Sequence, residues 1–165
     1  MTSADRRTRK GEMATTVVLS TFRANGLLLS AGDQLARQEG LTSAHWQVMG
    51  AIQLSERPLT MPQIARRMGL ARQSVHTTVA NLVREGLAEL TPNLDHARSQ
   101  FVSLTALGRR KYDAIDRRQG AWINELVEAI PLRDLEAAAR LLDVFCARLE
   151  SSGAVGVAGK EGGTR

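Results

Sequence analysis

The segment from Leu59 to Val79 constrains the fold more than any other part of this 165-residue chain. Thr60 and Gln63 have the spacing of a capping box, so they predict the start of a short helix. Gly69 supplies a turn, and a second helix is expected from about Ala71. This second helix carries apolar residues at the spacing of one helical face: Val75, Val79 and Leu82. The segment therefore predicts two short helices joined by a tight turn.

A β-hairpin is expected after these helices. Leu87–Thr91 and Gln100–Leu104 are short runs with alternating or β-branched residues, and the stretch Pro92–Ser99 between them is rich in turn formers. A helix-turn-helix followed by a two-stranded hairpin is a winged helix. The predicted fold class is therefore mainly α, an α+β winged helix, with further helices contributed by both ends of the chain.

Both ends of the chain predict long helices with broad apolar faces. We expect a disordered basic arm at 1–12, a helical dimerisation lobe from 13–40 and 105–150, a winged helix-turn-helix lobe at 41–104, and a disordered glycine-rich tail at 151–165. One winged helix is too small to cover both faces, whereas a second copy of the chain would cover them. The alternative is that these faces pack on their own lobe.

Positive charge is concentrated beside the predicted helix-turn-helix. The net charge is +5, and residues 57–118 contain eleven Arg or Lys against five Asp or Glu. Such a footprint favours a polyanionic partner, because each neutralised phosphate releases counterions. A solvated basic face that keeps the protein soluble is the alternative interpretation.

Other features exclude several classes of protein. No apolar run is long enough for a membrane span, and residues 1–12 lack the pattern of a secretory signal. Cys146 is the single cysteine, which fits a cytoplasmic protein without a disulfide, and its place on the apolar side of the last helix predicts a buried, inert thiol. His45, His76 and His96 do not have metal-ligand spacing, and no catalytic constellation is present. We therefore expect no enzyme, no metal and no cofactor.

The outer face of the second helix carries side chains that can read DNA. Arg pairs bidentately with guanine, Gln with adenine, and Thr offers a methyl group or a hydroxyl. The expected contacts on this helix are Arg72, Gln73, Ser74, His76 and Thr77. Thr60 and Arg66 are candidate phosphate contacts, and Arg98 at the hairpin tip is a candidate for the minor groove. The alternatives are a solvated helix face and a mobile hairpin tip.

The chain resembles the MarR family of bacterial transcriptional regulators. The resemblance covers about Leu41 to Ile115 and depends on several pieces in a fixed order. They are Leu41–Met49, Leu59-Thr60 with Ile64-Ala65, Arg72–Val75 with Leu82 and Glu85–Leu87, Asn93–Ser99, and Val102–Thr105 followed by Gly108. One departure is that Ala97 precedes Arg98, where many family members have two basic residues, and His96 stands near the position of an acid.

The resemblance implies a homodimer in which each winged helix reads half of a pseudo-palindromic operator in double-stranded DNA. It also implies control of gene expression, often repression that a phenolic or other lipophilic ligand relieves, with a ligand pocket between the lobes. Candidate pocket residues are Phe22, His45, Trp46 and Met49, although capping and core packing explain such residues as well. Two alternatives stay open: a winged-helix protein-interaction module, and an architectural DNA binder that needs no effector.

Overall fold

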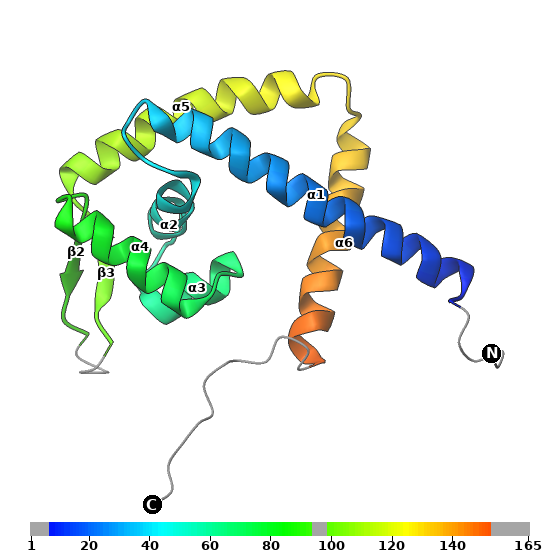
Figure 1. Cartoon of the computed structure of the whole chain (residues 1–165), viewed down its shortest axis with the longest axis horizontal. Helices are drawn as coiled ribbons and strands as arrows, with labels where there is room; N and C mark the ends of the chain where they lie inside the picture. Colours follow the sequence, from blue (N-terminus) through cyan, green and yellow to red (C-terminus); the bar gives the residue numbers. More distant parts are fainter. Residues whose placement is uncertain (1–6, 94–98, 153–165) are drawn as a thin grey trace, which may run out of the picture. The chain divides into compact units, whose positions relative to one another are not determined.

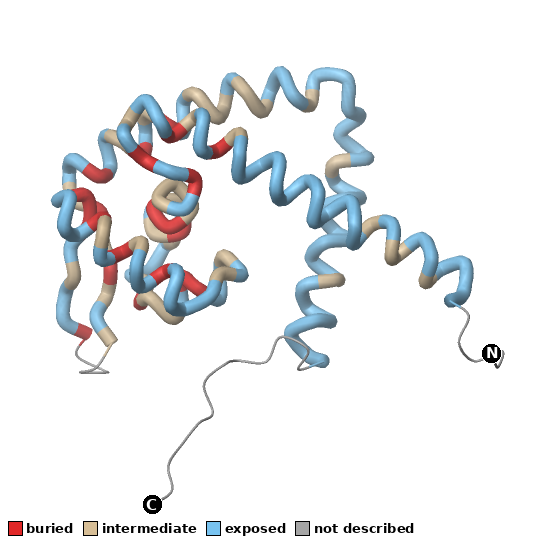
Figure 2. The backbone as a smooth tube through the Cα atoms, viewed as in Figure 1, coloured by how far each residue is buried: buried red, intermediate tan, exposed pale blue. Residues whose placement is uncertain are grey.

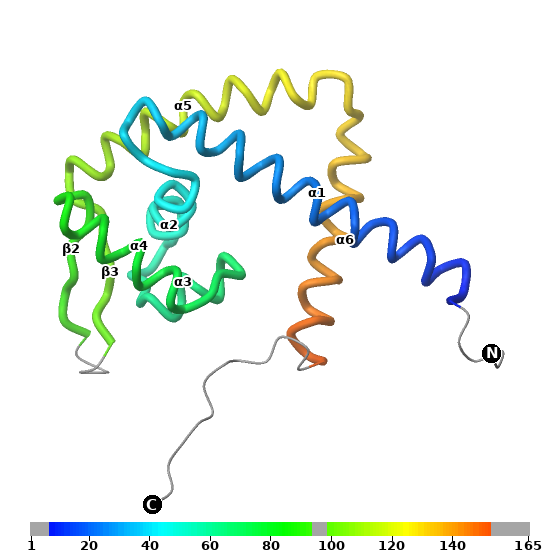
Figure 3. The backbone as a smooth tube through the Cα atoms, viewed as in Figure 1, coloured from blue at the N-terminus to red at the C-terminus, as the bar shows by residue number. Residues whose placement is uncertain are grey.

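The computed structural model describes residues 7–93 and 99–152, and this part contains six α-helices and three β-strands (Figure 1). The elements are α1 (Arg9–Arg37), α2 (Ser43–Gln53), β1 (Leu59–Thr60), α3 (Met61–Met68), α4 (Arg72–Arg84), β2 (Ala88–Thr91), β3 (Phe101–Leu104), α5 (Ala106–Val127) and α6 (Leu132–Ser151). This confirms the predicted class, a mainly α winged helix with a small antiparallel sheet. The path of the chain through these elements can be followed in Figure 3.

The chain divides into two compact units, residues 1–121 and 122–165, and α5 spans the boundary between them. Buried residues gather in the first unit, on α2, α3, α4, the strands and the start of α5 (Figure 2). The sequence predicted a winged-helix lobe at 41–104. The first unit contains this range and also α1 and most of α5, which pack with the winged helix.

The helix-turn-helix forms for local reasons. The N–H of Thr60 donates to Oε1 of Gln63 at 2.8 Å, which fixes the first turn of α3. Gly69 ends α3 with a φ of +62°, a left-handed conformation that glycine adopts without steric cost. The apolar face of α4 is fully buried at Val75, Val79 and Leu82, as the spacing predicted.

The sheet has three strands in the order β1-β3-β2, one more than the predicted hairpin. Leu59 of β1 pairs with Val102 of β3, while Leu90 of β2 pairs with the same residue from the other side. β1 is only two residues long, so its sequence carries no alternating pattern that would reveal it. The pairing ties the start of α3 to the hairpin.

The start of α5 is anchored on the end of α4. Thr105 caps α5 by accepting from the N–H of Gly108 at 3.1 Å, and its hydroxyl donates to the carbonyl of Gly86 at 2.7 Å. Further along α5, Arg118 forms an ion pair of 2.6 Å with Glu39 after α1. These contacts hold α5 against both α1 and the winged helix within the first unit.

The helix α1 begins at Arg9, four residues before the predicted start at Met13. The side chain of Thr8 accepts from the N–H of Gly11 at 3.1 Å, so the helix is capped inside the stretch expected to be disordered. Residues 1–6, like 153–165 of the predicted tail, lie outside the described residues. At its other end α1 approaches α2 closely, because Gly32 leaves room for Ser43 and the ring of Trp46.

Asp33 joins α1 to α2. Its Oδ1 accepts from the N–H of Ser43 at 2.6 Å, which caps the first turn of α2. This hydrogen bond is the main cause that lowers the pKa of the Asp33 carboxyl from its ordinary value of 3.8. The charged carboxylate therefore stabilises the junction of the two helices.

The second unit contains α6, whose apolar side chains are largely exposed within the single chain. Cys146 is also exposed, so the expectation of a buried thiol is wrong for the isolated chain. The physical reason is that the apolar side of α6 has no covering element in its own unit. No helix in the described ranges is both long and apolar enough to cross a bilayer.

Candidate nucleic-acid interface

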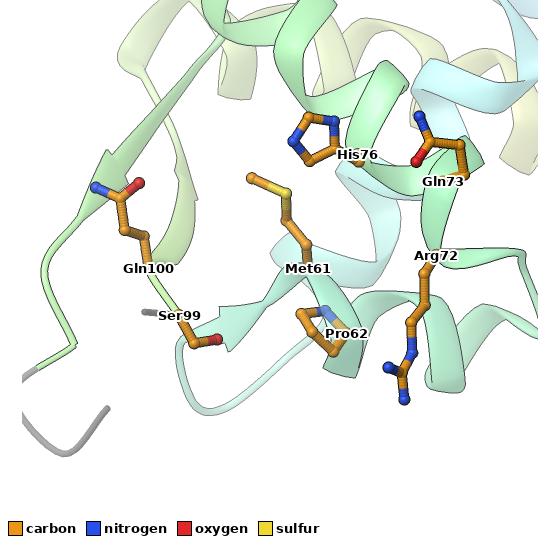
Figure 4. A pocket seen from close by; sticks show the side chains of 7 residues that line it. All are labelled: Met61, Pro62, Arg72, Gln73, His76, Ser99 and Gln100. Carbon is orange, nitrogen blue, oxygen red and sulfur yellow. The ribbon is translucent and has the colours of Figure 1, made fainter. Parts of the chain in front are cut away.

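A groove of about 390 Å³ lies between the two helices of the helix-turn-helix and the hairpin (Figure 4). Its residues come from three elements: the start of α3, the first half of α4, and the residues that lead into β3. They are Met61, Pro62, Arg72, Gln73, His76, Ser99 and Gln100. The groove therefore brings together three of the predicted DNA contacts with four residues that were not predicted.

The five predicted contacts on α4 are all exposed: Arg72, Gln73, Ser74, His76 and Thr77. Because Val75 and Val79 face the core, the opposite side of the helix faces outward. The hydroxyl of Thr77 donates to the carbonyl of Gln73 at 3.0 Å, which leaves its methyl group and one lone pair for a partner.

Within the described ranges, three polar side chains of the groove have no hydrogen-bond or ion-pair partner. Arg72, Gln73 and His76 form no side-chain hydrogen bond or ion pair with any other described residue. Arg72 carries five N–H donors and Gln73 both donors and an acceptor, which is the equipment for reading base edges in a major groove. The arrangement places these groups on a rigid helix whose other face is locked in the core.

Thr60 and Arg66 differ in their placement. Thr60 is only 6% exposed, and its hydroxyl donates to Oε1 of Gln63 at 2.9 Å. The capping box thus accounts for Thr60, and we leave it out of the proposed contact set. Arg66 is exposed on α3, whereas its neighbour Arg67 donates to the carbonyl of Leu54 at 3.2 Å and so supports the fold.

The hairpin tip holds the remaining predicted contact, Arg98, which lies outside the described residues. Directly after it, Ser99 and Gln100 line the groove opposite α4. Sequence reasoning missed both residues because nothing in the sequence indicates that this part of the hairpin faces α4. Ser99 directly precedes the predicted strand and Gln100 begins it, so their position next to Arg98 was the available signal.

The four candidate ligand-pocket residues have different surroundings in the described part of the chain. Met49 is fully buried in the core, and the ring of Trp46 packs near Gly32. His45 caps its own helix, since the N–H of Thr42 donates to its Nδ1 at 3.2 Å. Phe22 is 70% exposed on α1 and keeps its side chain available for another surface. In the described ranges no three His, Cys, Asp or Glu side chains are grouped to hold a metal ion.

Comparisons with known proteins agree with this architecture. The model of the MarR family matches residues 39–99. The uncharacterized protein Rv2011c of Mycobacterium tuberculosis is 41% identical over 121 residues, which is 73% of this chain and 83% of that protein.

Two solved structures share the fold. The M. tuberculosis transcriptional regulator MosR in complex with DNA is 24% identical, with a TM-score of 0.67 over 82% of this chain and 96% of that chain. CouR from Rhodococcus jostii RHA1 bound to p-coumaroyl-CoA is 22% identical, with a TM-score of 0.68 over 75% of this chain and 87% of that chain. The family match, the 41% identical relative and the winged-helix architecture together show that this chain belongs to the MarR family of transcriptional regulators.

Proposed function

We propose that the chain is a homodimeric, sequence-specific transcriptional repressor. Each subunit reads half of a pseudo-palindromic operator with α4, and a small lipophilic or phenolic ligand releases the DNA. The observation that carries the proposal is the exposed face of α4, where Arg72, Gln73 and His76 stand without partners among the described residues beside a groove. Unpartnered polar side chains on the helix that follows the turn are what direct readout requires.

Exposed apolar side chains support the dimer. Phe22 and Leu27 on α1 are 70% and 62% exposed, and Leu132 on α6 is 70% exposed. A soluble protein rarely leaves several such residues open to water, so these helices are expected to pack against a second copy. A two-fold dimer matches an inverted repeat in DNA, because each recognition helix then meets an equivalent half-site.

A small ligand is expected to act within the first unit, where α1 meets α2. CouR, which shares this fold, was solved bound to p-coumaroyl-CoA. In this chain Asp33 and Gly32 join α1 tightly to α2, so a shift of α1 would move the winged helix with it. Phe22 remains the most accessible of the candidate ligand contacts.

The decisive experiment selects bound sequences from a random pool of duplex DNA and then measures affinity by fluorescence anisotropy. The selected sequences should form an inverted repeat. Arg72→Ala should lose about 1–3 kcal/mol of binding free energy on that repeat and relax base preference at one position in each half-site. Arg84→Ala is the matched control, since it removes the same side chain about 18 Å away at the other end of α4.

The same assay separates the alternatives. Tight binding without any enriched motif would contradict sequence-specific readout and favour an architectural DNA binder. No binding to DNA at all would favour a protein-interaction module. Phenolic acids such as p-coumarate are then added to the operator complex. Unchanged affinity across a panel of phenolic and lipophilic compounds would contradict the ligand-released part of the proposal.

A further inference from the structure

We infer that α5 bends at Gly120, just beyond a clamp that Arg118 forms with Glu39, and that this bend sets the range of half-site separations that the protein accepts. The inference rests on the proposed function, since it assumes a dimer that reads two half-sites. It goes further by assigning specificity for operator spacing to residues on α5 and after α1, none of which is among the proposed DNA contacts.

The part of α5 that precedes Gly120 is held to the end of α1 by two cationic side chains. Nη2 of Arg118 donates to Oε1 of Glu39 at 2.6 Å. Lys111, about two turns earlier on α5, donates from Nζ to the backbone carbonyl of Glu39. Nη1 of Arg118 is buried, so solvent screens this ion pair less than one at an open surface. These contacts anchor α5 within the first unit as far as Arg118.

Gly120 follows this anchor by two residues and lies in the interior of α5, a continuous helix from Ala106 to Val127. A Cβ atom at Gly120 would meet no described atom within 4 Å, so packing within the chain does not require glycine there. Gly108 in the same helix differs, because a Cβ atom there would clash with the backbone of Leu87. Glycine is a poor helix former, and a helix bends more easily where it occurs. Gly120 is therefore a flexible point without a packing role among the described residues.

The position of Gly120 coincides with the division of the chain. The first compact unit ends at Ala121 and the second begins at Trp122, so the chain passes from one unit to the other within α5. A hinge requires a few residues at such a boundary that absorb a change in backbone angles. The clamp at Arg118 keeps the change local, because the part of α5 before it is fixed to Glu39.

A bend at this boundary has a direct consequence for DNA binding. In the proposed dimer, α6 contributes exposed apolar side chains to the contact between the copies, whereas α4 belongs to the first unit. A bend between the units therefore changes the separation of the two α4 helices. One additional base pair moves the half-sites about 3.4 Å further apart and rotates one relative to the other by about 35°. A dimer that bends at Gly120 can follow this change, whereas a stiff dimer cannot.

The test measures affinity for the selected operator and for the same half-sites separated by one additional base pair. The spacing ratio is the first affinity divided by the second. A variant that only folds less well lowers both affinities equally and leaves the ratio unchanged. Gly120→Ala should raise the spacing ratio about fivefold, the factor that follows from the difference in helix propensity between alanine and glycine.

The matched control for Gly120→Ala moves the glycine by one residue. Ala121 is exposed, so the double variant Gly120→Ala/Ala121→Gly keeps the composition of α5 and restores a flexible point beside the boundary. It should return the spacing ratio to the wild-type value. A ratio that stays as high as in Gly120→Ala would contradict a hinge that depends on backbone flexibility.

The clamp is tested by a second pair of variants. Arg118→Ala should lower the spacing ratio towards one, because α5 is then no longer tied to Glu39 and can move over a longer stretch. Arg117→Ala removes a neighbouring exposed arginine that has no ion pair with another described residue, and it should leave the ratio unchanged. The expected effects of Arg118→Ala and Gly120→Ala are opposite in sign, so a general loss of stability cannot produce both.

The outcomes distinguish the inference from the function beneath it. A wild-type protein that selects no inverted repeat would contradict the proposed function. Selection of an inverted repeat, with a spacing ratio that Gly120→Ala leaves unchanged, would keep the function and overturn the hinge. A ratio that Arg118→Ala leaves unchanged would overturn the clamp.

Discussion

Gly108→Ala should destabilise the protein, although alanine is the better helix former. Gly108 lies in the first turn of α5, where a Cβ atom would stand 2.0 Å from the carbonyl oxygen and 2.9 Å from the carbonyl carbon of Leu87. Both atoms belong to the backbone, so no side chain can rotate away. That oxygen also accepts the N–H of Thr105 at 3.0 Å, and α5 must therefore move away from the end of α4.

The magnitude follows from three contributions. Overpacking of this kind costs about 1–3 kcal/mol. Weakening the hydrogen bond from Thr105 to Leu87 costs about 1 kcal/mol more, and the higher helix propensity of alanine offsets about 1 kcal/mol. The net loss in the free energy of unfolding is about 1–3 kcal/mol, or about 2–12 °C in Tm for a chain of this size.

Urea denaturation and thermal unfolding at a fixed protomer concentration measure this loss. Gly120→Ala is the matched control in the same helix, because a Cβ atom there meets nothing within 4 Å. It should stabilise the protein by about 0.5–1 kcal/mol. The two substitutions are chemically identical, so opposite signs isolate the close approach at Gly108. A Gly108→Ala protein as stable as Gly120→Ala would refute the reasoning.

Four further results are expected. Asp33→Ala should lower stability at neutral pH, and the difference from the wild type should shrink as the pH falls from 3.8 through the lowered pKa of the folded state, because protonation of the carboxylate removes its stabilising effect; a difference unchanged in acid would contradict this. Thr60→Val should cost about 1 kcal/mol of stability but leave operator affinity unchanged, since its hydroxyl bonds within the capping box; weaker DNA binding by a fully folded variant would restore Thr60 as a contact. Phe22→Asp should shift the protein from dimer to monomer in analytical ultracentrifugation, by placing a charge in the proposed interface; an intact dimer would exclude that face. Hydroperoxide should leave operator affinity unchanged in the wild type and in Cys146→Ser alike, because the single cysteine has no resolving thiol in its own chain; a response that vanishes in Cys146→Ser would show a redox role.

Local features were predictable because their causes lie within a few residues of one another. Thr60 and Gln63 start α3, Gly69 ends it, and the period of Val75 and Val79 sets which side of α4 is buried. Those features also predicted that Arg72, Gln73 and His76 face outward. The fold class followed, since a helix-turn-helix and a hairpin in this order leave few ways to cover one core.

Other features depend on contacts between distant parts of the chain. Strand β1 exists because Leu59 pairs with Val102, forty-three positions away, and two residues alone carry no strand signal. Asp33 caps α2 from ten residues before it, and Cys146 is exposed because no element of its unit covers α6. Sequence periodicity reports which residues are apolar, but not which surface covers them.

The groove combines a feature that the sequence predicts with one that depends on tertiary packing. The sequence alone predicted which face of α4 is exposed, because its buried and polar residues repeat with the helical period. Only the tertiary structure brought Met61 and Gln100 to opposite sides of one groove with His76, since three elements that are separate in the chain must pack before their side chains share a space.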